Sequence, residues 1–270
     1  MAELQFYDAH NHLQVDSLAS VWDPVITSAA EVGVRRMVVN GSTEEDWEVV
    51  EQLARKYPLV YPSFGLHPWY IQERSKHWRE RLIEFLDRTP SAIGEIGLDR
   101  WIEGYDLPAQ EEVFLWQLDL AAERNLPASI HCLRAWGRLY DLLREHRRPE
   151  RGFLLHAYGG SAEMVPVLAK LGAYFSISGQ YAHDWKKRQR ETFRSIPRDR
   201  ILIESDAPFM FPPDHLREFE LDGADGGKPW NHPANLRAIY RFVAELLEIP
   251  IEELSAQVEE NFFRLFGRTA

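Results

Sequence analysis

Residues 6–13 have the sequence FYDAHNHL, and this stretch decides between the folds that the rest of the chain allows. Its apolar and aromatic residues favour a short buried strand, which is followed by a polar loop and a helical pattern. Seven further runs of this kind occur at 35–41, 59–67, 91–99, 127–132, 152–160, 173–179 and 200–207. Their starts lie about 20–35 residues apart, as expected when one crossover helix follows each strand.

The segments between these strands carry helical signals. Ser42, with Glu45 three residues later, has the pattern of a capping box, and residues 110–125 place apolar side chains at helical spacing. Two last helices are expected over 233–247 and 251–266. Eight strand–helix units predict an α/β fold, a single (β/α)8 TIM barrel domain over residues 1–270.

The main alternative fold is a doubly wound parallel sheet with additional strands. Such a sheet needs a glycine-rich phosphate loop directly after its first strand. The sequence has His10, Asn11 and His12 at that place, which favours the barrel. The longest irregular segment, 211–232, then follows the eighth strand, on the face where the active sites of barrels lie.

The charge balance limits how this chain can bind nucleic acid. Its 270 residues include 31 Lys+Arg against 42 Asp+Glu, which gives a formal net charge of −11. Because a long nucleic-acid footprint requires clustered positive charge, this balance argues against binding along an extended duplex. The one dense basic run, 186–200, is interpreted as a solvated helix face.

The composition indicates an ordinary soluble globular protein. Hydrophobic residues make up 45% and charged residues 27%, which excludes a disordered chain. The single cysteine, Cys132, cannot form an internal disulfide, so a reducing compartment is expected. The N-terminal residues lack a signal-peptide pattern, and no apolar run is long enough for a membrane span. We therefore expect a cytoplasmic protein without a membrane partner.

Polar, ionisable residues recur where the predicted strands end. In chain order they are His10, His12, His67, Glu95, His131, His156 and Asp206. A lone strand histidine is more often a hydrogen-bonded core residue, but a set buried together without a cation would carry a heavy desolvation cost. His10 and His12, two apart on a strand, form a chelating pair suited to Zn²⁺, whereas Mn²⁺ or Mg²⁺ would accept more oxygen ligands.

Motifs along nearly the whole chain resemble those of the TatD-like metal-dependent hydrolases of the amidohydrolase superfamily. They are DAHNH (8–12), GLHP (65–68), GEIGLD (94–99), the helix 110–125 running into LPASIHC, HAYGGS (156–161), ESDAP (204–208), NHPANL (231–236) and NFFRLFG (261–267). The resemblance implies a distorted barrel with one or two divalent metal ions. It also implies metal-dependent phosphodiester hydrolysis, often deoxyribonuclease action that includes 3′-end trimming of single strands.

The resemblance also implies roles for individual residues. His10, His12 and Asp206 would bind the first ion, His131 and His156 the second, and Glu95 both. Asp206 would take a proton from the attacking water, so the catalytic residues would be Asp206, Glu95 and His67. His67 would lie beside the scissile phosphate, and Glu204 would support the metal ligands from behind.

The sequence departs from the family pattern around the substrate mouth. Arg134 follows His131 by three residues, whereas the family usually has an arginine two residues after this histidine. Arg134 is a candidate substrate-binding residue, one position further along the loop than the arginine of the family. Arg100 and Trp101 follow GLD in place of the usual aromatic residue, and Asn-His-Pro at 231–233 replaces the commoner Asn-Glu-Pro.

The remaining histidines, the cysteine and the tryptophans receive simpler interpretations. Cys132 is expected to be a small buried hydrophobe that points away from the pocket. Four tryptophans lie near strand-end loops: Trp69, Trp101, Trp136 and Trp230. Each is expected either to pack in the core or to stack on a base of the substrate. Substrate contact is open for His183 and His232, and surface positions are expected for His77, His146 and His215.

Three functions are open at this point. The leading one is a metal-dependent phosphodiesterase or deoxyribonuclease that acts on a short or single-stranded DNA end or on a small phosphodiester. The second is hydrolysis of an amide, ester or lactone, because a fold alone does not fix a function. Glu95 stands where many amidohydrolase relatives have a modified lysine, which favours the first. The third, a non-catalytic scaffold, conflicts with the complete ligand set.

Overall fold

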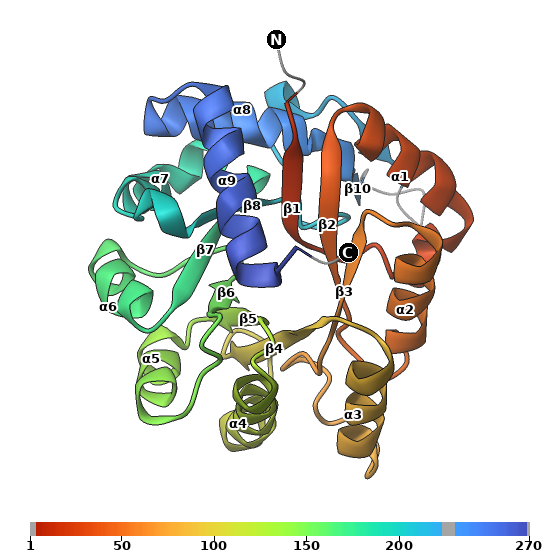
Figure 1. The fold of residues 1–270 in the computed structure, drawn as a ribbon. Coiled ribbons are helices and arrows are strands. Elements are labelled where there is room, and N and C mark those ends of the chain that lie inside the picture. Colours follow the sequence, from red (N-terminus) through yellow and green to blue (C-terminus); the bar gives the residue numbers. More distant parts are fainter. Residues whose placement is uncertain (1–3, 223–229, 269–270) are drawn as a thin grey trace.

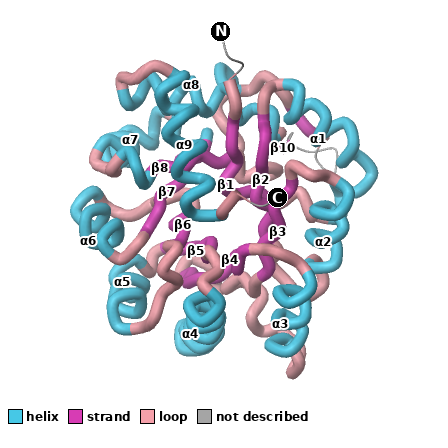
Figure 2. Tube along the Cα trace, in the orientation of Figure 1, coloured by secondary structure: helices cyan, strands magenta, loops and turns pink. Residues whose placement is uncertain are grey.

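A ring of strands lies at the centre of the computed structural model, which describes residues 4–222 and 230–268. Within these residues, eight parallel strands pair in chain order. They are β1 (Phe6–Asn11), β2 (Val34–Asn40), β3 (Val60–Phe64), β4 (Ala92–Asp99), β5 (Ala128–Leu133), β6 (Phe153–Leu155), β7 (Ala173–Ser178) and β8 (Ile201–Glu204). Figure 2 shows the strands in magenta, surrounded by helices in cyan. The predicted TIM barrel is confirmed.

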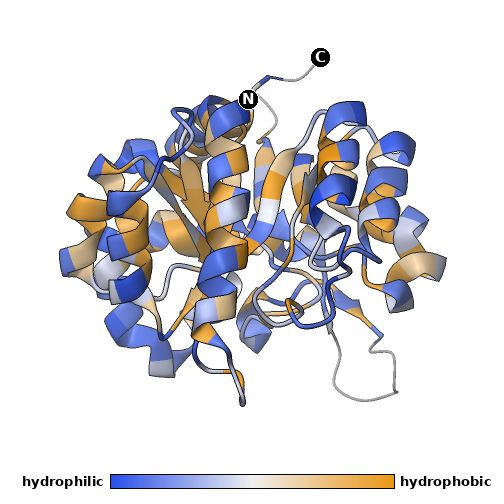
Figure 3. Cartoon of the chain, turned by 90° about the horizontal axis from the view of Figure 1, so that it is seen from below, coloured by the Kyte–Doolittle hydropathy of each residue, from blue (hydrophilic) through white to orange (hydrophobic). Residues whose placement is uncertain are grey.

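Helices α1 to α8 surround the strands, and α9 lies across one end of the barrel, as Figure 1 shows. The described α-helices are α1 (Trp22–Glu31), α2 (Trp47–Lys56), α3 (Trp78–Arg88), α4 (Leu107–Arg124), α5 (Trp136–Glu145), α6 (Val165–Lys170), α7 (Lys187–Arg194), α8 (Leu236–Leu247) and α9 (Ile251–Phe266). Hydrophobic residues face the strands and hydrophilic residues face outward (Figure 3). Among the described helices, none is long and apolar enough to cross a membrane.

The barrel has a seam between its first and last strands. No β-ladder joins β8 to β1 in the described part of the chain. Just beyond β8, the Asp206 amide donates to the His10 carbonyl (3.0 Å) and the His12 amide donates to the Ala207 carbonyl (2.7 Å). Nearer the start of β1, the Tyr240 hydroxyl of α8 accepts from the Tyr7 amide and donates to the Tyr7 carbonyl, both at 3.0 Å. The seam is therefore closed by loop backbone and by a side chain.

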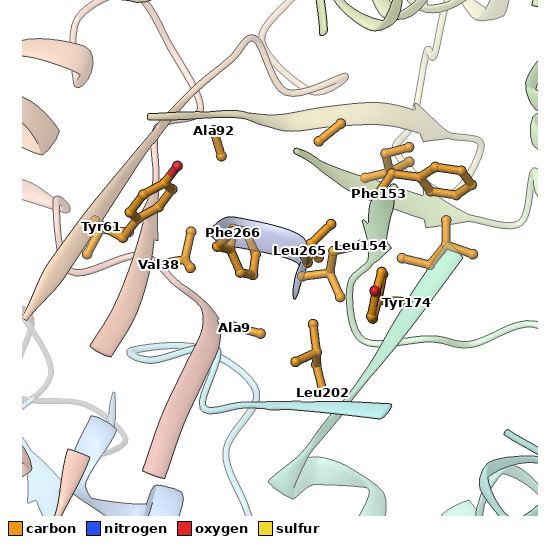
Figure 4. Close-up of a cluster of buried hydrophobic side chains, with 14 of the residues drawn as sticks. Ala9, Val38, Tyr61, Ala92, Phe153, Leu154, Tyr174, Leu202, Leu265 and Phe266 are labelled. Atoms are coloured by element: carbon orange, nitrogen blue, oxygen red, sulfur yellow. The ribbon is translucent and has the colours of Figure 1, made fainter. Parts of the chain in front are cut away.

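Helix α9 closes the amino-terminal end of the barrel with apolar side chains. Figure 4 shows Leu265 and Phe266 at the centre of the strands, among residues that include Ala92 and Leu202. Ala92 is the first residue of β4 and Leu202 the second of β8, so this cluster lies where strands begin. Leu265 and Phe266 are completely buried. The opposite end, where strands finish, is left for polar residues.

Several boundaries differ from the sequence expectations. The capping box at Ser42 is wrong: α2 begins at Trp47, and the Asp46 carboxylate accepts hydrogen bonds from the Ser42 and Thr43 amides, which forms a turn before the helix. Helix α4 begins at Leu107 rather than residue 110, because the Asp106 side chain caps it by accepting from the Ala109 amide (3.1 Å).

The C-terminal helices and the long loop also differ in detail from the expectations. The helix expected from residue 233 begins with a 3₁₀ turn, Pro233–Asn235, before α8, whereas α9 matches its predicted range. The segment 211–232 is irregular, apart from a 3₁₀ turn at Asp214–Leu216 and a small pair of strands, β9 (Glu220–Leu221) and β10 (Trp230–Asn231). Its residues 223–229 lie outside the described residues.

Candidate metal centre and active site

The end of β1 brings two histidines into contact. His10 and His12 are buried, and their Nε2 atoms are 3.1 Å apart. On the other side of each ring, His10 Nδ1 lies 2.8 Å from Ser129 Oγ, and His12 Nδ1 donates to the Asn40 carbonyl (3.1 Å). Because a carbonyl can only accept, the proton of neutral His12 is on Nδ1, and its Nε2 lone pair faces His10. This orientation is the one that a metal ligand requires.

Glu95 of β4 lies between two groups of histidines and offers one oxygen to each. Its Oε2 is 3.5 Å from His10 Nε2 and 3.2 Å from His12 Nε2. Its Oε1 is 3.0 Å from His131 Nδ1 and 2.9 Å from His156 Nε2. Burial alone would raise the pKa of Glu95, but the surrounding histidines hold it well below its usual range. A carboxylate with its two oxygens directed at separate donor sets is suited to bridge two cations.

The second donor set joins β5 to β6. His131 Nδ1 and His156 Nε2 are 3.3 Å apart, and His131 Nε2 lies 2.8 Å from Asp99 Oδ2 at the end of β4. Burial works against ionisation of Asp99, but hydrogen bonds from His131 and Trp69 lower its pKa to about 2. An ionised Asp99 fixes the proton of His131 on Nε2, which leaves Nδ1 to bind a cation.

The approach of β4 to β5 depends on a glycine. Gly97 has a φ of +146°, and a Cβ at this position would lie 2.0 Å from the carbonyl oxygen of His131. Glycine therefore lets the two strands carry Glu95, Asp99 and His131 into one small volume.

Asp206 lies two residues beyond β8, beside the first histidine pair. Its backbone has a φ of 50°, in the left-handed region, and its amide is bonded to the carbonyl of His10 across the seam. Its Oδ1 is 3.8 Å from His10 Nε2 and 3.6 Å from His12 Nε2, and it is buried without a hydrogen-bond partner in the described part of the chain. Burial raises the pKa of Asp206 to about 7. A buried, unpartnered carboxylate oxygen facing two imidazole nitrogens fits a cation between them.

Glu204, the last residue of β8, lies behind the second set. Its Oε1 is 3.6 Å from His156 Nδ1, beyond hydrogen-bond distance, and neither atom has a hydrogen-bond partner among the described residues. Its Oε2 accepts a short hydrogen bond from Ser176 Oγ. The structure thus places Glu204 on the side of His156 that faces away from Glu95.

His67 differs from the other histidines in the nitrogen that carries the proton. Its Nδ1 accepts a hydrogen bond from the Trp69 amide (3.2 Å), so in the neutral ring Nε2 bears the hydrogen. That Nε2 lies 3.3 Å from Glu95 Oε1. Burial lowers the pKa of His67 to about 4, which keeps the ring neutral. His67 therefore presents a hydrogen-bond donor to the site rather than a lone pair.

The donor atoms fit one or two divalent ions. In a tetrahedral site with ligands at about 2.0–2.2 Å, neighbouring donor atoms are roughly 3.3–3.6 Å apart. The Glu95 oxygens lie 2.9–3.5 Å from the nitrogens of His10, His12, His131 and His156. Asp206 Oδ1 lies 3.6–3.8 Å from those of His10 and His12, so all these separations are close to that range. Within the described residues, the donor groups close enough to hold an ion include His10–His12–Glu95, His67–Glu95–His131 and His10–His156–Glu204.

Several supporting residues were missed by the sequence analysis. Asp99 was quoted only as part of a motif, although its position two residues beyond Gly97 at a strand end was a usable signal. Asp8 accepts from the Ser205 amide (2.8 Å) and hydroxyl (2.5 Å), and so ties β1 to the loop that carries Asp206. Burial raises the pKa of Asp8 to about 7. Nothing in the sequence could assign Ser129 to His10, because that contact joins β1 to β5, two strands that are not neighbours in the barrel.

The structure brings together all of the predicted residues except Arg134. Arg134 is exposed, with its guanidinium 6.0 Å from the ring of Trp101. Trp69 is 41% exposed and Trp101 57%, whereas Trp136 packs against Tyr158 and Trp230 is half-buried. Both open tryptophans therefore flank the mouth above Asp99, and Trp69 Nε1 donates to Asp99 Oδ2 (2.7 Å).

The other singled-out residues have structural positions. Cys132 is buried, and burial raises the pKa of its thiol well above the usual value. His232 is buried, and its Nδ1 accepts from the Ala234 amide (3.0 Å) at the start of a 3₁₀ turn. His77 and His215 are exposed and His146 is half-buried. His183 lies in the loop after β7, where its Nε2 donates to the carbonyl of Phe211 (3.0 Å).

Comparisons with known proteins agree on one family. The family model described as TatD related DNase matches residues 7–267. The metal-dependent hydrolase YabD of Bacillus subtilis is 31% identical over 96% of this chain and 98% of its own length. The 3′-5′ ssDNA/RNA exonuclease TatD of Escherichia fergusonii is 30% identical over 97% and 98%. The crystal structure of the TatD homologue YjjV from Escherichia coli superposes with a TM-score of 0.89 at 26% identity, covering 99% of this chain and all of that one.

Proposed function

This chain belongs to the TatD-related DNase family, and from that premise we propose that it is a divalent-metal-dependent hydrolase that removes nucleotides from single-stranded DNA ends. The observation that carries the proposal is the position of Glu95, whose two carboxylate oxygens face separate sets of histidine nitrogens. Two-cation sites of this kind are a recurrent solution to phosphodiester hydrolysis.

The cations would be held by residues from opposite sides of the barrel. His10, His12 and Asp206 would bind the first ion, and His131 and His156 the second, with Glu95 shared between them. Four imidazoles favour Zn²⁺, and the two carboxylates also suit Mn²⁺ or Mg²⁺. When bound, such ions supply Lewis-acid stabilisation of the charge that develops on the phosphoryl group.

Asp206 and His67 would act on the reacting atoms. Asp206 Oδ1 has no hydrogen-bond partner among the described residues and faces the proposed first ion site, so it can take a proton from the attacking water. His67 Nε2–H can donate to a phosphoryl oxygen. Asp99, by keeping the proton of His131 on Nε2, would orient a metal ligand without touching the substrate.

The shape of the site favours a strand end as substrate. His12, His67 and Asp206 are all less than 10% exposed, so a phosphodiester must enter the barrel mouth rather than lie across a surface. The net charge of −11 argues against a long duplex footprint. Trp69, Trp101 and Arg134 flank the mouth and would contact the nucleotide next to the scissile bond.

Activity on a panel of substrates tests this proposal. The purified protein is stripped with a chelator, reloaded separately with Zn²⁺, Mn²⁺ or Mg²⁺, and given 5′- and 3′-labelled single strands, duplex DNA, bis-nitrophenyl phosphate, esters and amides. We expect cation-dependent cleavage of phosphodiesters that Asp206→Asn and Glu95→Gln both abolish. Turnover confined to esters or amides, or phosphodiester cleavage that survives both substitutions, would contradict the proposal.

The location of the protein in the cell is part of the proposal. Cys132 is free and buried, which suits a reducing compartment, and we propose the cytoplasm. Cell fractionation with an antibody to the native chain checks this, and recovery in a secreted or periplasmic fraction would contradict it.

A further inference from the structure

The loop that follows β7 exposes an aromatic side chain that the site described above does not use. Trp185 is 74% exposed, more than any other large hydrophobic residue in the described part of the chain. Its indole stacks on the imidazole of His183, with ring centroids 4.0 Å apart and planes 17° from parallel. A single exposed hydrophobic residue is ordinary, so its surroundings decide whether Trp185 forms part of a site.

Hydrogen bonds hold this loop in place. The Arg190 guanidinium of α7 reaches back to the carbonyls of Tyr181 (3.2 Å), Ala182 (2.9 Å) and His183 (3.1 Å). His183 also donates to the carbonyl of Phe211 in the loop after β8 (3.0 Å). Trp185 is therefore a flat apolar surface on a fixed support, which reduces the entropy lost when a ligand stacks on it.

The first half of the basic run 186–200 differs from the second. In the described residues, no carboxylate lies within ion-pair distance of Lys186, Lys187 or Arg188, although Arg188 is near enough to Glu163 to help lower the pKa of that carboxyl. Lys187 and Arg188 are exposed. Further along, the basic residues are paired, Arg194 with Glu191 and Arg198 with Glu253 (2.5 Å). Residues 184–190 hold four basic residues and one aspartate, a net charge of +3 on a chain of −11. Lys187 and Arg188 lie exposed on α7, as expected for a solvated helix face, whereas Arg198 lies beyond the end of this helix.

A path of contacts joins this loop to the metal centre. The ring of Phe209, 49% exposed, lies with its centroid 5.6 Å from that of His12. Two residues further on, Phe211 accepts the hydrogen bond from His183, on which Trp185 stacks. Figure 1 shows α7, which continues this loop, next to α8 on the β7–β8 side of the barrel. The loop that carries Trp185 is therefore bonded to the loop that carries Phe209 beside the metal centre.

We propose that Trp185, Lys187 and Arg188 form an outlying subsite for single-stranded DNA. In this subsite Trp185 stacks on an unpaired base, and the positively charged side chains of Lys187 and Arg188 contact backbone phosphates. The subsite rests on the proposed function and extends it, because it binds nucleotides several positions from the scissile bond. Aromatic stacking beside unpaired positive charge is the usual way to hold a single strand without reading its sequence. A duplex, whose bases are already stacked, cannot use Trp185.

The first test compares a long and a small substrate. Steady-state kinetics are measured for Trp185→Ala and Trp185→Phe on a 12-nucleotide single strand and on bis-nitrophenyl phosphate. We expect Trp185→Ala to raise KM for the 12-mer about 5- to 100-fold, as for loss of one stacked base. Trp185→Phe, which keeps an aromatic ring, should have a KM close to that of the wild-type protein. Turnover of bis-nitrophenyl phosphate should not change, because this ester does not reach the loop. An unchanged KM for the 12-mer would overturn the proposal.

The second test isolates the charges. Lys187→Gln/Arg188→Gln is compared with Arg147→Gln/Lys170→Gln, which removes the same charge from exposed positions just beyond α5 and at the end of α6, on the amino-terminal side of the barrel. Binding of a fluorescent 12-mer is followed by anisotropy at several salt concentrations. Loss of two phosphate contacts should reduce the slope of log Kd against log salt by about 1.4, and the control should leave it unchanged. Equal slopes in both double variants would count against the subsite.

The binding measurement also separates this proposal from the proposed function. Anisotropy in an Asp206→Asn background needs no catalysis, so weaker 12-mer binding on Trp185→Ala supports the subsite even if no cleavage is found. Cleavage of both substrates by the wild-type protein, with no effect of Trp185→Ala on KM or Kd, would keep the proposed function and overturn the subsite.

Discussion

The two ends of the barrel are equally buried and chemically opposite. At the amino-terminal end, Leu265 and Phe266 of α9 fill the space between the strands with hydrocarbon. At the carboxyl-terminal end, His10 and Glu95 are also 0–2% exposed, yet they are ionisable. Burial therefore stabilises the fold at one end, by about 1.5–3 kcal/mol per large apolar side chain, and carries a desolvation cost at the other. Sites of chemistry and sources of stability are spatially separated along the barrel axis.

Asp206→Asn gives the largest expected difference between the ends. The substitution removes the proposed proton acceptor and one metal ligand, so we expect kcat on a single-stranded oligonucleotide to fall by about 10²- to 10⁴-fold. The free energy of unfolding should stay the same or rise, because a buried charge is lost. Urea unfolding beside the kinetics checks both. A strongly destabilised variant would show that the carboxyl-terminal end supports the fold after all.

Phe266→Ala makes the opposite change at the amino-terminal end. Truncating this buried side chain should reduce the free energy of unfolding by about 3–5 kcal/mol, while kcat per folded molecule is retained. Val167→Ala, at a position 36% exposed on α6, is the control and should stay within about 0.5 kcal/mol of the parent. A loss of kcat in folded Phe266→Ala protein would contradict the view that the amino-terminal end stabilises the fold without affecting catalysis.

Asp99→Asn tests how precisely the carboxyl-terminal end is arranged. The amide cannot keep a charge beside His131, so we expect the affinity for added Zn²⁺ or Mn²⁺ to fall about 10- to 100-fold. Calorimetric titration measures it. Trp69→Phe removes only the second hydrogen bond to Asp99 Oδ2, and a smaller loss is expected. Equal metal affinity in Asp99→Asn and wild-type protein would show that Asp99 does not help His131 to bind the metal ion.

Tyr240→Phe gives the smallest expected effect, at the seam that connects the two ends. The change leaves the buried Tyr7 amide and carbonyl without their partner, at an expected cost of about 1–3 kcal/mol in the free energy of unfolding. Tyr57→Phe, whose hydroxyl bonds Asp23 at an exposed position, is the matched control and should change little. Equal stabilities of the two variants would mean that water replaces Tyr240 at the seam.

The sequence predicted the repeating parts of the structure well, because each depends on local pattern. The strand–helix rhythm identified the barrel, and polar residues predicted at strand ends lie close together in the structure, since parallel strands finish on one face. Interactions that depend on the packing of distant segments were not visible. Asp99 orients His131 only because Gly97 lets β4 and β5 approach, and Asp46 replaces Ser42 before α2 because it can bond two loop amides at once.

The basic run 186–200 shows the same limit. Its composition indicated a solvated helix face, but the pairing of each charge could not be read from the sequence. The structure separates a half whose charges form ion pairs, around Arg194 and Arg198, from a half beside Trp185 that forms none with the described residues.

The seam determines when, during synthesis, the active site can exist. Tyr7 is bonded to Tyr240, and Asp8 to Ser205, contacts that join residues 233 and 197 positions apart. Loops this long close late in folding, because their entropy is lost before the contact is gained. A ribosome that has made only the first two hundred residues therefore carries His10 and His12 on an unfinished edge, without Asp206 and without α8. The segment that supplies Asp206 and α8 must therefore be synthesised before the site beside His10 and His12 can be completed.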